Sequence, residues 1–144
     1  MVWEDFTGSI DRSSPFDAFT KWNMRYKFSN VKMDSDSIRL KNFEAILELD
    51  PQKSWSKQDR QTDALLEHEQ GHFNIGKLCL NEMVNQLRTT AFASNNFPGA
   101  IKELLNATIN KYVKMEMEYD EETNHSKNKS NQEKWNEYFK SSLK

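Results

Sequence analysis

The segment Leu65-Leu66-Glu67-His68-Glu69-Gln70-Gly71-His72-Phe73 decides how the rest of the chain is interpreted. It contains the pattern His68-Glu69-x-x-His72, which on a helix places two imidazoles one turn apart on the same face. Side chains at this spacing lie about 5–6 Å apart, so both can reach one Zn²⁺ ion through bonds of roughly 2.0–2.1 Å. Glu69 borders the metal instead of ligating it and can accept a proton from activated water. The segment therefore predicts the zinc site of a hydrolase.

The scarcity of histidine supports this interpretation. The chain has three histidines among 144 residues, and two of them fall in this pattern. The alternative is a solvated helix face that carries two histidines by chance, and we favour the metal site. The single cysteine, Cys79, excludes an intrachain disulfide and a thiolate zinc site.

Length and composition restrict the other possibilities. The length predicts one domain over residues 1–144, with mostly strands in 1–55 and mostly helices in 56–144. The net charge is −2 and no basic block is present, so nucleic-acid binding is not expected. No run of 18 apolar residues exists, so no membrane span is expected. Residues 1–5 do not resemble a signal peptide, although trimming of a leader would leave the same start.

Two extended segments precede the motif. Apolar and polar residues alternate strictly from Thr20 to Phe28, which predicts a half-buried strand, and residues 29–37 are rich in turn formers. A second strand is predicted for Ile38 to Leu49. Its apolar residues change parity part-way, so a bulge or bend near Asn42 is expected. A helix over residues 41–49 is the alternative, but the Asp50-Pro51 stop favours a strand.

Helices dominate the remainder. Ser56-x-x-Asp59 predicts a capped start, and the motif helix then continues to about Ala91. Gly76, one turn past His72, indicates a close approach by a substrate or by a neighbouring strand. The segment 95–99 breaks the chain, and amphipathic helices are predicted for 101–119 and 131–139. The sequence as a whole predicts an α+β fold with a small antiparallel or mixed sheet packed on a long helix.

A catalytic zinc ion normally has a third protein ligand. His125, at the end of the second long helix, is the first candidate because imidazole is a good zinc ligand. Asp120 is the second, either as a ligand or as a hydrogen-bond partner of a ligating imidazole. Glu116, a carboxylate within an apolar face, is the third. Tyr119 is a candidate donor to an oxyanion, although its apolar stripe also suits a core residue.

Several motifs together resemble a known bacterial family. They are Trp3-x-x-Phe6, Ser54-Trp55, Leu66-x-His68-Glu69-Gln70-Gly71-His72-Phe73, Tyr119-Asp120-x-Glu122-Thr123-x-His125 and Gln132-x-x-Trp135. The chain is similar in these positions to the domain of unknown function 922, whose members are often described as predicted secreted zinc-dependent proteases.

This resemblance implies a zincin-like fold, with the first two ligands on one helix and the third supplied from downstream. It implies that His68 and His72 are ligands, that Glu69 is the general base and that residues 119–125 form part of the site. Ser126 departs from the family pattern, in which a glycine is expected after the histidine. The resemblance also favours a secreted or periplasmic protein, with a cytoplasmic one as the alternative.

We therefore expect a zinc-dependent metallopeptidase acting on peptide or protein substrates, with Glu69 as general base and His68, His72 and either His125 or Asp120 as ligands. One of the strands, such as 38–49, is expected to pair with an extended substrate. The alternatives are a non-catalytic binding module stabilised by a metal and a metal-dependent hydrolase of a non-peptide bond.

Overall fold

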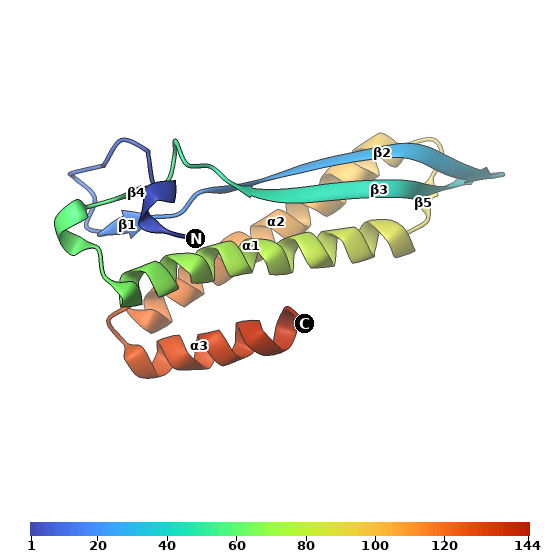
Figure 1. Cartoon of the computed structure of the whole chain (residues 1–144). Helices are drawn as coiled ribbons and strands as arrows, with labels where there is room; N and C mark the ends of the chain where they lie inside the picture. The colour runs from blue at the N-terminus through green and yellow to red at the C-terminus, as the bar shows by residue number, and fades with distance from the viewer.

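A long β-hairpin lies along a layer of helices, as Figure 1 shows. The structure, a computed structural model, describes the backbone of residues 1–144 and all side chains except those of Ser29, Asn30 and Lys32. The elements in chain order are η1 (Trp3–Asp5), β1 (Ala18–Phe19), β2 (Trp22–Asp34), β3 (Ser37–Leu49), β4 (Trp55–Ser56), η2 (Gln58–Arg60), α1 (Asp63–Thr89), β5 (Phe92–Ala93), α2 (Phe97–Thr123) and α3 (Lys129–Ser142).

Two antiparallel sheets form the N-terminal layer. One has the order β2-β3-β5 and the other pairs β1 with β4. This arrangement, followed by three helices, confirms the predicted α+β class. Among the described residues, no helix combines the length and the apolar character that crossing a membrane requires.

The β2–β3 hairpin differs from expectation in length. β2 continues to Asp34 and the turn is confined to residues 35–36, so the longer turn region predicted for 29–37 is wrong. The helical alternative for 41–49 is also wrong, because this segment belongs to β3.

The predicted irregularity at Asn42 is present as a bend. Asn42 has a φ of 52°, and the buried side chains change parity there, from Ile38 and Leu40 to Phe43. The pairing register is the same on both sides, Val31 with Leu40 and Phe28 with Phe43. No residue is inserted, so the bend redirects the apolar face without a bulge.

Helix α1 begins later than the sequence indicated. Its N-cap is Thr62, whose hydroxyl accepts a hydrogen bond from the Leu65 N–H at 3.1 Å. The expected Ser56 cap is wrong because residues 58–60 form the short helix η2 before α1 starts.

Helix α1 is the central element and contacts the sheet on one side and α2 and α3 on the other. Its buried side chains include Ile75, Cys79 and Leu87, each 0% exposed, and burial of a large aliphatic side chain contributes about 1.5–3 kcal/mol. Gly76 faces Trp22 and Leu47, so its small size serves packing against β2 and β3. This packing holds the histidine-bearing turn of α1 between the sheet and α2.

Candidate metal centre

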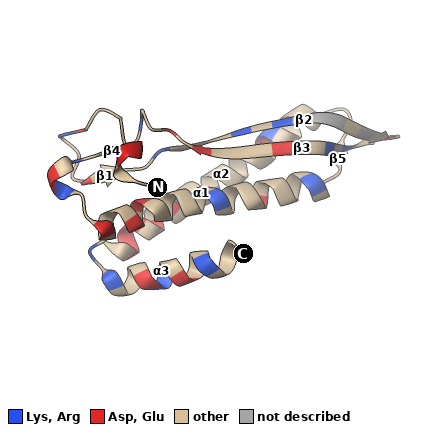
Figure 2. Cartoon of the chain, in the orientation of Figure 1, with Lys and Arg blue, Asp and Glu red and all other residues tan. Residues whose placement is uncertain are grey.

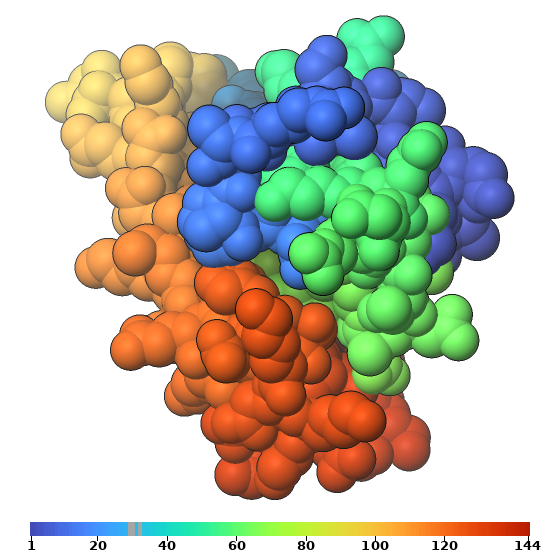
Figure 3. All heavy atoms as spheres, turned by 90° about the vertical axis from the view of Figure 1, so that its left-hand side faces the viewer, coloured from blue at the N-terminus to red at the C-terminus, as the bar shows by residue number. Residues whose placement is uncertain are grey.

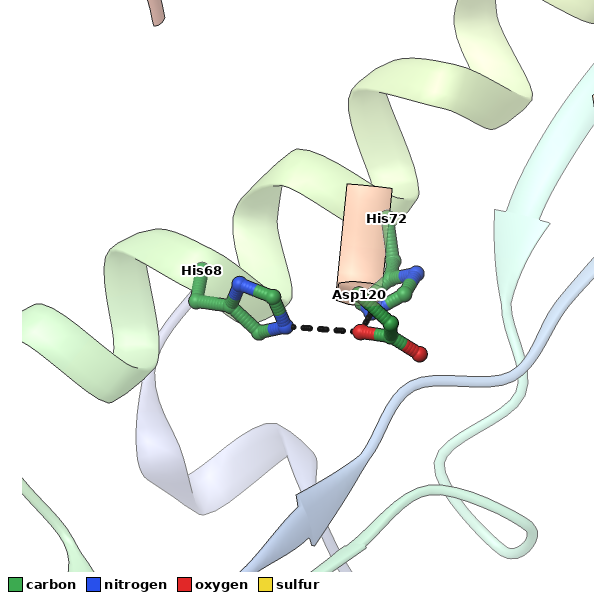
Figure 4. A group of neighbouring side chains, drawn as sticks. All are labelled: His68, His72 and Asp120. Atoms are coloured by element: carbon green, nitrogen blue, oxygen red, sulfur yellow. Dashed lines mark hydrogen bonds and ion pairs between the residues drawn. The ribbon is translucent and has the colours of Figure 1, made fainter. Parts of the chain in front are cut away.

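The two histidines of α1 converge on one carboxylate from α2. The Nε2 atoms of His68 and His72 each lie 3.0 Å from Oδ1 of Asp120, as Figure 4 shows. One ligand atom from each of the three residues lies within 4.8 Å of the others. His68 is 1% exposed, while His72 and Asp120 are partly exposed, so the group is open on one side only.

Hydrogen bonds behind His68 determine which of its nitrogens carries a proton. The Tyr119 hydroxyl donates to the His68 carbonyl at 3.0 Å, so the hydroxyl oxygen accepts from the Gln132 amide Nε2 at 2.7 Å. The other amide atom of Gln132, Oε1, then faces His68 Nδ1 at 3.1 Å and accepts its proton. The contacts of Thr123 support a proton on Nδ1. Its hydroxyl donates to the Tyr119 carbonyl and faces the same Nδ1 at 3.3 Å, so it can only accept from that nitrogen. Neutral His68 therefore presents the lone pair of Nε2 to Asp120.

This geometry requires a positive charge between the histidines and Asp120. A lone pair and a carboxylate oxygen 3.0 Å apart repel each other unless a proton or a metal ion lies between them. Burial lowers the pKa of His72, but hydrogen bonds to Asp120 and Glu116 and the charge of Glu69 outweigh burial and raise that pKa to about 10. Burial raises the pKa of Asp120, but the two imidazoles hold it well below its usual range. Without metal, a proton on His72 supplies a positive charge that faces Asp120.

The donor set fits a divalent transition metal. Two imidazole nitrogens and one carboxylate oxygen are ligands that Zn²⁺ accepts in catalytic sites. With bonds of roughly 2.0–2.2 Å, the donors of one ion lie no more than about 4 Å apart. The observed separations of up to 4.8 Å require side-chain adjustments of less than about 1 Å. The site can therefore hold a metal ion with little rearrangement.

Glu116 supports His72 from the side opposite Asp120. Its Oε1 accepts a hydrogen bond from the Trp22 indole N–H at 2.8 Å and lies 3.6 Å from His72 Nδ1. A carboxylate at this nitrogen favours a proton on Nδ1 and leaves Nε2 for a metal. Among the three candidates for third ligand, Glu116 is thus placed behind a histidine and not among the converging donor atoms.

The carboxylate of Glu69 is held at one oxygen and open at the other. Thr20 donates to Oε2 at 2.6 Å. No described hydrogen bond involves Oε1, and within the described residues no fully buried side-chain oxygen lacks a partner. Because Glu69 also lines the cavity at the site, its Oε1 reaches that cavity. Glu69 thus lies where a proton acceptor is expected.

Tyr119 is buried behind His68. Its ring stacks on the His68 imidazole with centroids 4.6 Å apart, and its side chain is 0% exposed. Its single proton is donated to the His68 carbonyl, and the residue does not line the cavity. These contacts match the alternative of a core residue, one that positions His68, and the oxyanion role of Tyr119 stays a prediction.

Gly71 gives Tyr119 the space for this position. A Cβ atom on Gly71 would lie 2.1 Å from the Tyr119 hydroxyl oxygen and 2.5 Å from Cζ, closer than any van der Waals contact allows. The helix thus gives up the stability that alanine would add, about 1 kcal/mol, to keep the hydroxyl against the His68 carbonyl.

We expect Gly71→Ala to lower the free energy of unfolding by about 1–3 kcal/mol, because the new methyl displaces a fully buried aromatic ring. Gly76→Ala is the matched control. An added methyl there would lie 3.0–3.2 Å from side-chain atoms of Trp22 and Leu47, which can shift by a few tenths of an ångström, so its effect is smaller. Chemical denaturation of both variants measures the difference. Stabilisation by Gly71→Ala would contradict the packing described here.

His125 lies beside the candidate metal-binding group of His68, His72 and Asp120 but outside it. Its Nδ1 is 3.3 Å from Asp120 Oδ1, its ring contacts the Phe16 ring in a tilted arrangement with centroids 4.4 Å apart, and it is partly exposed. The structure therefore places Asp120 among the converging atoms and His125 at their edge. Which of the two is the third ligand stays a prediction.

The turn after α2 carries three consecutive residues with positive φ. Asn124 and His125 each have φ 47° and Ser126 has φ 75°. The family pattern implied glycine at position 126, and the backbone explains why, since residues with a Cβ rarely adopt this conformation. The turn aims His125 at Asp120 at the expense of strain at Ser126.

Ser126→Gly is expected to stabilise the protein by about 0.5–1 kcal/mol, because glycine relieves the left-handed conformation. Ser141→Gly within α3 is the control and should destabilise by a similar amount, since glycine weakens a regular helix. Thermal unfolding of both variants tests the difference in sign. Equal destabilisation by the two changes would show that Ser126 is unstrained.

A cavity of about 400 Å³ opens onto the site. One wall is the continuous segment 15–24, which includes β1 and the start of β2, and the others are α1 and α2. In Figure 3 the blue N-terminal segment lies directly above the orange part of α2. His68, Glu69, His72, Glu116, Asp120 and His125 all line this cavity. Figure 2 shows acidic residues gathered at this end of the molecule, where α1 begins and α2 ends.

The fold and the site define an α+β protein whose first long helix carries two histidines that meet a carboxylate from the second. A comparison with protein families identifies the family of the chain. A family described as "Bacterial protein of unknown function (DUF922)" matches residues 3–126, and the chain belongs to this family. The match ends before Gln132-x-x-Trp135. No curated protein and no solved structure matches the chain.

Two residues of the site had no role in the expectation from the sequence. Thr20 holds Glu69, and Trp22 holds Glu116. Each acts through a contact with a residue at least 49 positions away in the chain, so local spacing could not identify it. For Thr123, which contacts His68, and for Gln132 the only signal was their place in the family motifs.

Proposed function

We propose that this protein is a zinc-dependent peptidase. The observation that carries the proposal is the convergence of His68, His72 and Asp120 on one point, beside a glutamate with one oxygen free, at the end of an open cavity. A purely structural zinc site has four protein ligands and needs no such glutamate. The zincin-like character of the fold and export from the cell stay predictions.

The chain's own residues suit this reaction. A zinc ion at the site would supply a Lewis acid for a water molecule and for the substrate carbonyl. Glu69 accepts the proton of the attacking water at Oε1 while Thr20 holds Oε2, and then delivers it to the leaving amine. Gln132 and Glu116 keep the Nδ1 atoms of the two histidines occupied, so that both Nε2 atoms face the cavity.

The sheet edge supports an extended peptide as substrate. β2 is an edge strand of its described sheet, and its first residues line the cavity. The Asp50 N–H donates to the Lys21 carbonyl, so by antiparallel alternation the N–H and C=O groups of Trp22 and Met24 point away from β3. A substrate backbone can pair with these groups. The expectation that residues 38–49 do so stays a prediction, because β5 pairs with β3 only at Ser37 and Ile38, but no residue of this segment lines the cavity.

The test is to prepare the chain without metal, add zinc, and measure bound zinc by mass spectrometry and cleavage of a mixed peptide library. We expect about one zinc per chain and cleavage only in the zinc-loaded protein. His68→Ala should abolish both. A chain that binds no added zinc would refute the proposal.

One observation favours a second function. His125 lies 3.3 Å from Asp120, close enough to join the same ion as a fourth protein ligand after a small movement. Such a closed site would stabilise a non-catalytic binding module. In that case zinc would raise the melting temperature while no peptide was cleaved. Cleavage of a non-peptide bond is the remaining alternative, and a panel of ester substrates tests it.

A further inference from the structure

One face of α2 presents apolar side chains to the cavity. Ile109, Val113 and Met117 follow one another at intervals of four residues and therefore share a face, and all three line the cavity. Val113 is 43% exposed and Met117 67% exposed. Exposed apolar side chains that continue into a polar site are typical of a ligand-binding surface.

The opposite wall of the cavity is also apolar at this end. Met24 and Trp22 of β2 line the same space, and the backbone groups that point to the sheet edge belong to these two residues. A substrate peptide paired with the edge of β2 would direct every second side chain toward the same wall of the cavity. The apolar face of α2 is part of the wall that these side chains would meet.

The distance from the metal-binding group is short. Met117 precedes Asp120 by three residues and Val113 by seven, which on a helix is about 4.5 Å and 10.5 Å along the axis. An extended peptide advances about 3.3 Å per residue. The part of the α2 apolar face formed by Val113 and Met117 therefore lies about one to three substrate residues from the bond to be cleaved.

We propose that the cavity selects extended peptides with a large apolar side chain within about three residues of the scissile bond, and that Val113 and Met117 contact this side chain. The inference rests on the proposed peptidase function for the identity of the ligand. The apolar wall carries the selectivity, because moving an aliphatic or aromatic side chain from water into contact with it is favourable and a polar side chain gains nothing there.

Binding can be tested without catalysis. The probes are fluorescein-labelled octapeptides of one composition, with Phe, Leu, Asn or Asp placed in turn at each central position. Fluorescence polarisation is measured with zinc-loaded Glu69→Gln protein, which keeps the ligands and leaves the peptides intact. We expect the best Phe or Leu peptide to bind at least about tenfold more tightly than its Asn counterpart.

Paired variants assign the selectivity to this wall. Val113→Thr with Met117→Gln keeps the side-chain sizes and adds polar atoms, and should reduce the preference to about threefold or less. Ile46→Thr is the control, since Ile46 is exposed and lies outside this cavity. Circular dichroism checks that each variant is folded.

Three results would overturn the inference: no peptide binding, equal binding of apolar and polar peptides, or a preference that survives the double variant. A preference removed by the double variant, in a protein whose active form cleaves no peptide, would support the inference and refute the peptidase function instead.

Discussion

Glu69→Gln is expected to lower kcat for peptide cleavage by about 10²–10⁴-fold while the zinc content stays the same. Glutamine has the shape of glutamate, and its oxygen can still accept the hydrogen bond from Thr20, so the fold is preserved. The amide at the other position cannot take a proton from water. Steady-state kinetics on a peptide that the unmodified protein cleaves, together with zinc analysis, measure both quantities.

Glu67→Gln is the matched control for this change. Glu67 also lies in the first part of α1 but does not line the cavity. Its replacement should leave kcat unchanged. Full activity of the zinc-loaded Glu69→Gln protein would rule out Glu69 as the proton acceptor.

Asp120→Ala is expected to weaken zinc binding by at least roughly a hundredfold, because it removes the carboxylate on which both histidines converge. His125→Ala should have a much smaller effect, since His125 lies outside the converging group. Competition with a coloured chelator measures both affinities. Glu121→Ala, which removes a neighbouring exposed carboxylate, should leave the affinity unchanged.

A larger loss of zinc affinity in His125→Ala than in Asp120→Ala would identify His125 as the ligand. If His125→Ala abolished binding and Asp120→Ala reduced it only about tenfold, Asp120 would be a hydrogen-bond partner of a ligand. Equal large losses would show that both residues bind the ion and would favour the closed site of a non-catalytic module.

The parts of the site that lie within one helical turn could be predicted from the sequence. The spacing of His68 and His72 fixes their common face wherever the helix lies, and it also places Glu69 beside it. Ranking Asp120 against His125 required knowing where α2 crosses α1. That crossing depends on Gly71, whose missing side chain admits the Tyr119 hydroxyl. No periodicity in the sequence encodes such a contact.

For the strands, too, local features could be predicted from the sequence and distant contacts could not. Alternation correctly predicted β2 and β3, and the parity change correctly located the bend at Asn42. The sequence could not show that the start of β2 lines the cavity while no residue of 38–49 does, because this placement depends on contacts between distant segments. The choice between the two strands for substrate pairing therefore required the structure.

The support of His68 by Gln132 has a consequence during protein synthesis. Gln132 lies 64 residues after His68, on the helix that leaves the ribosome after α1 and α2. Until α3 docks, the imidazole lacks the acceptor that orients it, even though all proposed metal ligands have been made. If the site binds a metal ion as proposed, a nascent chain would hold His68 in its final orientation toward that ion only once α3 has folded.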